Sequence, residues 1–264
     1  MVSGSSIPEA RGPDARLSRP GAARAGSSID TGLFTRSVLD YAAHRPGQVI
    51  SVLQFGCVTA DGDLDLAGPD ARRYQFAVTR LDEDNAVTRT AVARQPGLGQ
   101  AILADLRAVP LTPRSVDVVH CCRLLDRISH ADILLTRLVD ALRPGGLLLV
   151  RTADRQTAAG FLDRTLPRPL RALAWHRLRP GQPGPYPAIY EPLTSARGLQ
   201  AFATRHGLVV PGREATSGLA GQRRPVIAAS RALVSALSRG RLTAAHDELG
   251  YIIRKPEDRF ARVL

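Results

Sequence analysis

The sequence has very little lysine, cysteine or aromatic character. Lys255 is the only lysine among the 36 basic residues, and aromatic residues make up 5% of the chain. The arginines are scattered among abundant alanine, glycine, proline and leucine, without a basic run that interleaves aromatic residues. Compositional bias therefore explains the formal net charge of +12 better than a nucleic-acid interface does, and we expect no nucleic-acid partner.

The few cysteines exclude a paired disulfide framework and argue against a zinc site. Cys57, Cys121 and Cys122 are odd in number, two of them are adjacent, and no CxxC spacing occurs. This pattern favours a reduced, cytoplasmic protein without a metal. No apolar run approaches the ~20 residues that span a bilayer, and the N-terminal region lacks the apolar segment of a signal peptide. The sequence does not indicate an oligomeric state.

The length and composition predict one folded domain. A chain of 264 residues that is 44% hydrophobic can bury one complete core. Residues 1–28 contain almost no large apolar side chain, and this composition predicts a disordered tail. An RNA-binding arm is the functional alternative for the tail. We therefore expect the folded domain to cover residues 29–264.

Short apolar runs separated by helical patterns predict an α/β fold. The expected strands cover about residues 48–55, 74–81, 101–104, 115–121 and 147–152, with two more from about 208 and 249. Helices are expected over about 31–42, 129–143, 156–178, 195–206 and 225–238. Uninterrupted apolar strands indicate burial on both faces. We therefore expect a Rossmann-like, doubly wound, mostly parallel seven-stranded sheet.

Capping signals predict where several helices begin and end. The spacing of Ser129 and Asp132 resembles a capping box at a helix start, and Pro144-Gly145-Gly146 is typical of a helix terminator. Ser195 is expected to cap a helix that ends at His206, with Gly207 as the residue after it.

Residues 155–195 do not continue the alternation of strands and helices. A helical segment broken by Pro167 and Pro169 leads into a loop that is rich in proline and glycine. We interpret this stretch as a helical lid inserted after the fifth strand, over the substrate. Its side chains suggest an aromatic or lipid-like pocket formed by Trp175, Tyr186, Pro187 and Tyr190.

Polar or small residues follow the strands where a ligand is expected. In open parallel sheets, ligands bind beyond the carboxyl ends of the strands. These positions are Gly56, Asp82, Asp105 and Cys121. The turn at residues 56–62 has the place of a turn that cradles a phosphate or an adenosine, although it is poor in glycine.

Five segments, in order, resemble the class I S-adenosylmethionine-dependent methyltransferases. Residues 52–60 (VLQFGCVTA) match the family's V-L-D-x-G-C-G-x-G, and residues 78–82 (VTRLD) match V-x-G-V-D. Residues 104–111 (ADLRAVPL) match A-D-x-x-x-L-P-L, residues 115–119 (SVDVV) match S-F-D-V-V, and residues 142–148 (LRPGGLL) match L-R-P-G-G-x-L. The similarity covers residues 36–153 best.

The resemblance implies S-adenosylmethionine as cofactor and a site on the matching residues. The turn after the first strand, with Phe55, Gly56 and Cys57, would face the methionine and ribose parts. Asp82 with Glu83 would accept hydrogen bonds from the ribose hydroxyls. Asp105 would accept a hydrogen bond from the adenine amino group, and Leu106 would lie against the adenine ring. Cys121 would lie near the sulfonium. The resemblance names no catalytic residue, and methyl transfer depends mainly on alignment of the reacting groups.

Several positions depart from the family pattern. Gln54 stands at the usual acidic position, Val58 and Ala60 replace glycines, and Arg80 replaces a small residue. Alternative interpretations therefore stay open: Gly56 as a simple turn, Asp82 and Asp105 as caps or solvated loop residues, and His120 as a core histidine.

We expect a methyltransferase that acts on an oxygen or nitrogen of a small molecule. A non-catalytic binding or regulatory protein with the same fold is the alternative. NAD-dependent oxidoreduction fits less well, because no GxGxxG follows the first strand.

Overall fold

A computed structural model describes residues 32–56, 64–94, 101–178, 184–217 and 225–258 of the chain. The predicted tail over residues 1–28 lies outside the described residues, and so does most of the turn after the first strand, with Cys57, Val58 and Ala60. Predictions that concern these segments stay predictions.

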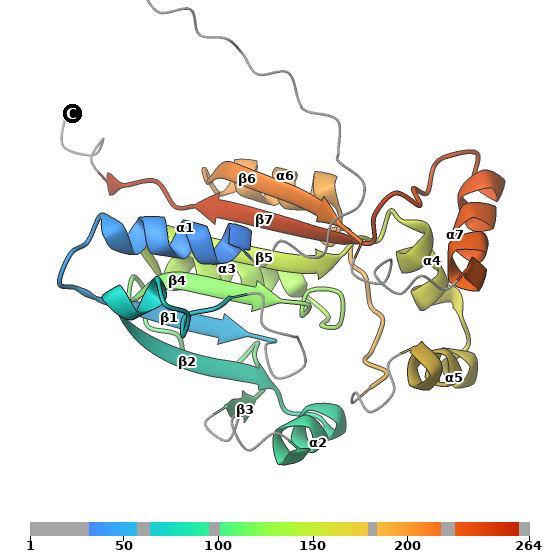
Figure 1. Cartoon of the computed structure of the whole chain (residues 1–264), viewed down its shortest axis with the longest axis horizontal. Coiled ribbons are helices and arrows are strands. Elements are labelled where there is room, and N and C mark those ends of the chain that lie inside the picture. Colours follow the sequence, from blue (N-terminus) through green and yellow to red (C-terminus); the bar gives the residue numbers. More distant parts are fainter. Residues whose placement is uncertain (1–31, 57–63, 95–100, 179–183, 218–224, 259–264) are drawn as a thin grey trace, which may run out of the picture.

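Seven strands form one sheet in the order β3-β2-β1-β4-β5-β7-β6. Strands β1 to β5 run parallel to one another, and β7 is antiparallel to both β5 and β6 (Figure 1). The prediction of a mostly parallel, seven-stranded α/β fold is confirmed. The strands are β1 Val49–Phe55, β2 Gln75–Glu83, β3 Ile102–Ala104, β4 Val116–Cys122, β5 Leu142–Ala153, β6 Val209–Thr216 and β7 Glu248–Arg254.

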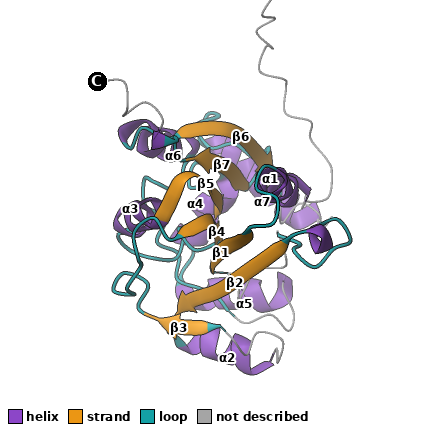
Figure 2. Ribbon diagram, turned by 90° about the vertical axis from the view of Figure 1, so that its left-hand side faces the viewer, coloured by secondary structure: helices purple, strands orange, loops and turns teal. Residues whose placement is uncertain are grey.

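Helices cover both faces of the sheet (Figure 2). On one face lies α1 (Gly32–Ala43), which buries Phe34 and Val38 against β1, β4 and β5. On the other face lie α3 (Ala131–Ala141) and α6 (Ala196–Arg205). Helix α2 (Ala86–Arg94), which the sequence patterns did not predict, lies beside the β3 edge.

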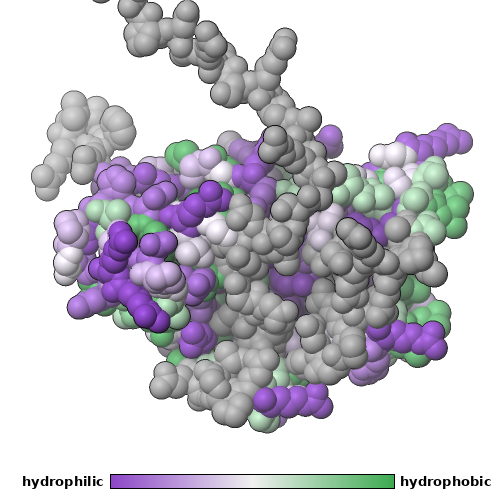
Figure 3. Space-filling model, in the orientation of Figure 1, coloured by the Kyte–Doolittle hydropathy of each residue, from purple (hydrophilic) through white to green (hydrophobic). Residues whose placement is uncertain are grey.

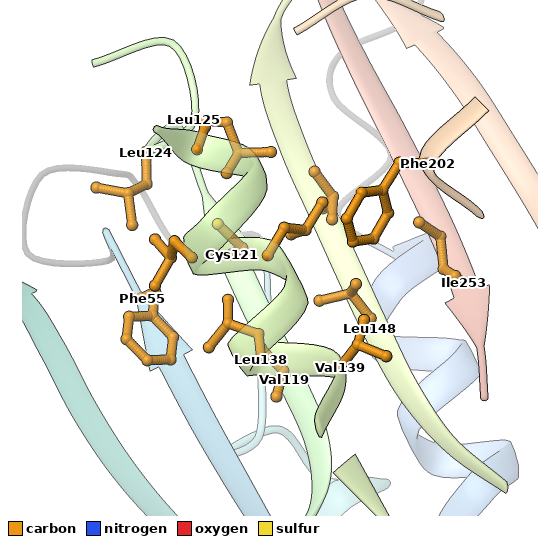
Figure 4. Close-up of a cluster of buried hydrophobic side chains, with 14 of the residues drawn as sticks. Phe55, Val119, Cys121, Leu124, Leu125, Leu138, Val139, Leu148, Phe202 and Ile253 are labelled. Carbon is orange, nitrogen blue, oxygen red and sulfur yellow. The ribbon is translucent and has the colours of Figure 1, made fainter. Parts of the chain in front are cut away.

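The larger core fills the space between the sheet and α3. Apolar residues of α3 recur at intervals of three and four residues, so that Leu134, Leu135, Leu138 and Val139 all point at the sheet. There they contact β4, β5, β7 and Phe202 of α6 (Figure 4). Each such side chain contributes about 1.5–3 kcal/mol when it is fully buried. This core holds the carboxyl ends of β4 and β5 rigidly in place.

The predicted end of the α3 helix is partly wrong. The helix does end before Pro144, but β5 already begins at Leu142, so Pro144-Gly145-Gly146 form its first part. A Cβ on Gly146 would lie 2.9 Å from the Asp117 carbonyl oxygen, which requires glycine there. Asp117 is 3% exposed and accepts hydrogen bonds from the Ser51 N–H and the Tyr41 hydroxyl.

The capping-box prediction at Ser129 is wrong, whereas the one at Ser195 is confirmed. Helix α3 starts after His130, and its first N–H groups are bound by a distant carboxylate, that of Glu191. The hydroxyl of Ser195 accepts the Gly198 N–H of α6 at 3.0 Å, and Gly207 after this helix has a φ of +62°.

Residues after β5 form a helical layer at one end of the molecule (Figure 1). It consists of α4 (Ala158–Thr165), α5 (Arg168–Leu178) and α7 (Pro225–Leu237). Pro167 separates α4 from α5, and Pro169 is accommodated in the first turn of α5, where its missing N–H costs nothing. Hydrophobic surface is visible at this end in Figure 3, where α5 and α7 expose Leu170, Leu173, Leu233 and Leu237.

Neither a membrane-spanning helix nor a metal-binding cluster occurs among the described residues. No described helix is long and apolar enough to cross a bilayer. Within the same residues, no group of three or more histidine, cysteine or acidic side chains is arranged to hold a metal ion.

Candidate functional site

The carboxyl ends of β1, β2 and β4 meet at one edge of the sheet. Phe55 at the end of β1 pairs with Leu81 of β2 on one side and with Cys121 of β4 on the other. Parallel pairing therefore brings Gly56, Asp82 and Cys121 to the same edge, as the sequence predicts. Asp82 and Glu83 belong to β2 itself, which ends two residues later than expected.

Gly56 is required by the packing of the chain itself. Its φ is +71°, and a Cβ built there would lie 2.2 Å from the Cys122 carbonyl oxygen and 3.1 Å from the Leu124 Cβ. Only glycine tolerates both the left-handed backbone and this contact. The close approach that the sequence predicts for a ligand is made here by the backbone that leaves β4. A role toward a ligand stays a prediction.

Carboxylates gather at the ends of β2 and β3. Asp82 is 1% exposed, and its Oδ1 accepts the Glu83 N–H at 2.8 Å. Burial raises the pKa of Glu83, and Asp105 and Asp82 add to the rise, whereas the Arg107 and Arg127 guanidiniums oppose it. Asp84 instead forms an ion pair with Arg89 on α2. At this edge Asp82 is buried and Glu83 is half-buried, whereas the exposed Asp84 is held by α2.

Asp105 closes a turn after β3. Its Oδ1 accepts the Arg107 N–H and the Arg107 Nε–H, each at 3.0 Å, and these bonds lower the pKa of Asp105. The interpretation as a turn cap therefore describes this residue. Leu106 and Cys121 are both 0% exposed in the larger core, so any contact with a ligand would require that core to open.

A polar layer lies beneath α1 at the same edge. The Arg80 Nε–H donates to Oε1 of Gln54 at 3.2 Å, so two of the departures from the family pattern form one pair. His120 is 2% exposed and lies edge-on to Phe34, and neither ring nitrogen has a hydrogen-bond partner among the described residues. Burial, with a smaller effect from Arg151, lowers the pKa of His120 to about 3. It is a neutral core histidine.

A cavity of about 280 Å³ lies beyond the ends of β4 and β5, between α4, α5 and α7. Trp175, Tyr186, Pro187 and Tyr190, which the sequence suggested as one pocket, all line it. The Trp175 and Tyr186 rings meet edge to face with centroids 5.7 Å apart. The structure therefore brings the predicted aromatic residues together in a single chamber.

Most charged groups in the cavity wall have partners. The Tyr190 hydroxyl donates to Oδ2 of Asp163 at 2.9 Å, and burial raises the pKa of Asp163. The Arg127 guanidinium lies 4.0 Å from the Tyr186 ring centroid. Arg231 pairs with Asp247 at 3.7 Å. The cavity is thus mainly aromatic and apolar, with a small number of fixed polar groups, as ligand sites usually are.

Two wall residues have a strained backbone. Arg123 and Tyr190 each have a φ of +48°, in the left-handed region that side-chain-bearing residues rarely adopt. Such strain tends to gather at functional sites, where the surrounding structure holds it. Tyr190 is held by its N–H bond to the Asp126 carbonyl oxygen and by its hydroxyl bond to Asp163.

Several cavity residues were not predicted from the sequence. Arg123, Asp126 and Arg127 follow β4 directly, a few residues beyond Cys121, which the sequence predicted at this strand end. Asp163 lies one turn after Ala159 on α4, and both residues face the cavity. Helical spacing within this segment is therefore a signal from which Asp163 could have been predicted. Arg231 comes from α7, whose distance in sequence gives no such signal.

Glu191, in the loop before α6, attaches this loop to the start of α3. Both of its carboxylate oxygens accept hydrogen bonds from the start of α3, from the His130 N–H at 2.7 Å and the Ala131 N–H at 3.0 Å. A carboxylate at a helix N-terminus is favoured by the helix dipole as well as by these bonds. This contact positions Tyr190 next to the residues that follow β4.

An open, mostly parallel sheet with carboxylates at the carboxyl ends of its strands defines a Rossmann-like class of fold. Residues 53–150 match the protein family described as a methyltransferase domain. This match covers the same part of the chain as the resemblance to the class I S-adenosylmethionine-dependent methyltransferases that the sequence motifs indicate.

Individual proteins are similar over parts of the chain. A ubiquinone biosynthesis O-methyltransferase of Agrobacterium fabrum is 28% identical over 125 residues, which is 46% of this chain and 47% of that protein. The chain thus matches about half the length of this curated relative.

Solved structures match the overall fold at low sequence identity. The CurJ carbon methyltransferase is 14% identical, with a TM-score of 0.50 over 86% of this chain and 54% of that chain. An S-adenosylmethionine-dependent methyltransferase from Mesorhizobium loti is 18% identical, with a TM-score of 0.48 over 86% of this chain and 100% of that chain.

Proposed function

We propose that this chain is an S-adenosylmethionine-dependent methyltransferase that acts on an oxygen or nitrogen atom of a small molecule held in the cavity beneath the lid. The family supports the cofactor, and the relative in Agrobacterium fabrum is named as an O-methyltransferase. The cavity volume of about 280 Å³ and its aromatic wall support a compact acceptor with an apolar body.

One observation carries the proposal: Arg127 lines the cavity and is close enough to the acidic edge for its charge to influence Glu83. Its charge acts on the Glu83 carboxyl at the end of β2, while its guanidinium stacks over Tyr186 inside the cavity. A nucleoside at the edge and an acceptor in the cavity would therefore be neighbours. Alignment of two bound reactants is the main requirement of a methyl transfer.

The residues at the edge fit an adenosyl group. Carboxylates accept hydrogen bonds from hydroxyl groups, and Asp82 and Glu83 stand at the position where such folds bind a ribose. When bound, S-adenosylmethionine supplies a methyl group activated by a sulfonium. In the cavity, the Asp163 carboxylate and the Tyr190 hydroxyl would orient the acceptor, and the lid would exclude water.

Calorimetric titration with S-adenosylmethionine tests the cofactor site. We expect Asp82→Asn and Glu83→Gln each to weaken binding at least about tenfold, because each removes a charged acceptor. Asp84→Asn is the matched control, since Asp84 pairs with Arg89 on α2 and should leave binding unchanged. Equal losses in all three variants, with native circular dichroism, would contradict the assignment of the edge.

A non-catalytic relative of the same fold is the second candidate. The Gln54–Arg80 pair occupies positions where the family pattern has an acidic and a small residue. In addition, the described residues 64–74 before β2 hold only the short 3₁₀ helix η2 (Ala71–Arg73). Absence of S-adenosylmethionine binding at millimolar concentration would favour this candidate.

A further inference from the structure

A second depression, outside the acceptor cavity, has arginines on three sides. It encloses about 340 Å³ and is lined by Arg155, Arg164 and Arg241, with Gln156, Pro192, Ser195 and Leu242 completing the wall. The three arginines come from the turn after β5, the end of α4 and the turn after α7 (Figure 1). None of the described residues that line it is acidic.

Backbone contacts bring the segments that carry Arg155 and Arg241 close together. Thr157 and Thr243 form a parallel bridge, the Ala158 N–H donates to the Thr243 carbonyl oxygen at 2.8 Å, and the Thr243 N–H donates to the Gln156 carbonyl oxygen at 3.3 Å. These contacts place residues 155–156 near residues 241–242. The Arg155 N–H donates to the Thr194 carbonyl oxygen at 2.9 Å, which attaches this turn to the start of α6.

The positive charges are not neutralised by the described part of the protein. Arg155, Arg164 and Arg241 form no salt bridge with a described residue, whereas Arg123 and Arg231 in the neighbouring cavity are both paired. Asp154, next to Arg155, is 3% exposed and pairs with His246 at 2.9 Å instead. Burial and the nearby Arg155 charge lower the pKa of Arg164.

Two further features favour an anion at this place. The Nη1 atom of Arg164 is buried and has no hydrogen-bond partner among the described residues, an arrangement that natural proteins rarely leave uncompensated. The N-terminus of the ten-residue helix α6 borders the depression at Ser195, and its first turn contains no acidic residue. The positive end of this helix therefore adds to the arginine charges.

We propose that Arg155, Arg164 and Arg241 form a binding site for a phosphoryl group, separate from the methyl-acceptor cavity. Planar guanidiniums bind phosphate oxygens in pairs, and three of them suit a dianion or a diphosphate better than a single carboxylate. Helix α4 is shared by both sites, because Asp163 faces the cavity and Arg164 the anion site. The ligand is a soluble phosphate ester or a phospholipid headgroup.

Titration with inorganic pyrophosphate tests the site without any methyl transfer, so its outcome is independent of the proposed function. We expect the full chain to bind pyrophosphate, and Arg155→Gln, Arg164→Gln and Arg241→Gln each to weaken binding about tenfold. Arg72→Gln, an exposed arginine of η2 remote from the depression in sequence, is the matched control and should bind like the unaltered chain.

Vesicles distinguish the two sources of the phosphoryl group. Sedimentation with vesicles that contain phosphatidic acid, reversed by pyrophosphate and lost in Arg164→Gln, identifies a lipid headgroup. Pyrophosphate binding without sedimentation identifies a soluble ligand. The proposal is overturned if millimolar pyrophosphate does not bind, or if the three variants and Arg72→Gln all bind as the unaltered chain does.

Discussion

Replacing Gly56 by alanine separates a structural role of this residue from a ligand-binding one. An alanine in the left-handed region costs about 1–2 kcal/mol. Its Cβ would also lie 2.2 Å from the Cys122 carbonyl oxygen, so the backbone that leaves β4 must shift. Overpacking of this kind costs about 1–3 kcal/mol, and the two effects together predict a loss of about 2–5 kcal/mol.

Two other glycines provide matched controls for the backbone effect. Gly47 and Gly207 have φ values of +73° and +62°, and an added Cβ would meet nothing within 4 Å at either position. Alanine at these positions should therefore cost only about 1–2 kcal/mol. The difference between Gly56→Ala and the two controls measures the contact with β4 alone.

Urea unfolding followed by far-ultraviolet circular dichroism, without any ligand, provides the measurement. We expect a lower midpoint with an unchanged slope, which reports stability rather than a change in the unfolded state. A loss for Gly56→Ala within about 0.5 kcal/mol of the controls would refute the packing argument. The glycine would then be explained by a ligand rather than by β4.

Two further predictions concern the lid contact and the buried histidine. Glu191→Ala should lower the free energy of unfolding by about 1–2 kcal/mol in the same assay, because α3 loses its cap and a favourable charge, and an unchanged midpoint would contradict this. Burial lowers the folded-state pKa of His120 to about 3 from the usual 6.5, so the unfolded chain binds a proton first as pH falls below 6.5. The free energy of unfolding of the parent chain should therefore drop by about 2 kcal/mol between neutral pH and about pH 5 because of His120. The His120→Leu variant should lack this part of the drop. Equal pH profiles of the two proteins would contradict the prediction.

Local sequence signals predicted the sheet well. Each strand that is buried on both faces appears as an apolar run, so β1, β4 and the later part of β5 were found within a residue or two. Ser195 and Gly207 lie at the ends of α6 as expected, because side-chain capping and a positive φ depend on a few neighbouring residues.

Features that depend on contacts distant in sequence could not be predicted in this way. The cap of α3 comes from Glu191, some 60 residues after the helix begins, so the nearby Ser129 was a misleading signal. The cavity combines residues of α4, α5 and α7 with the loop after β4, and no spacing within the sequence relates Arg127 or Asp163 to Arg231. For Gly56, the sequence could indicate that a side chain is excluded, but not which group excludes it.

A crystal structure with S-adenosylhomocysteine most directly tests the claim that the acidic edge and the lid cavity form one site. The account predicts that the ribose contacts Asp82 or Glu83 and that the sulfur faces the cavity beside Arg127. Binding of the ligand with its sulfur directed away from the Tyr186 and Tyr190 chamber would contradict it.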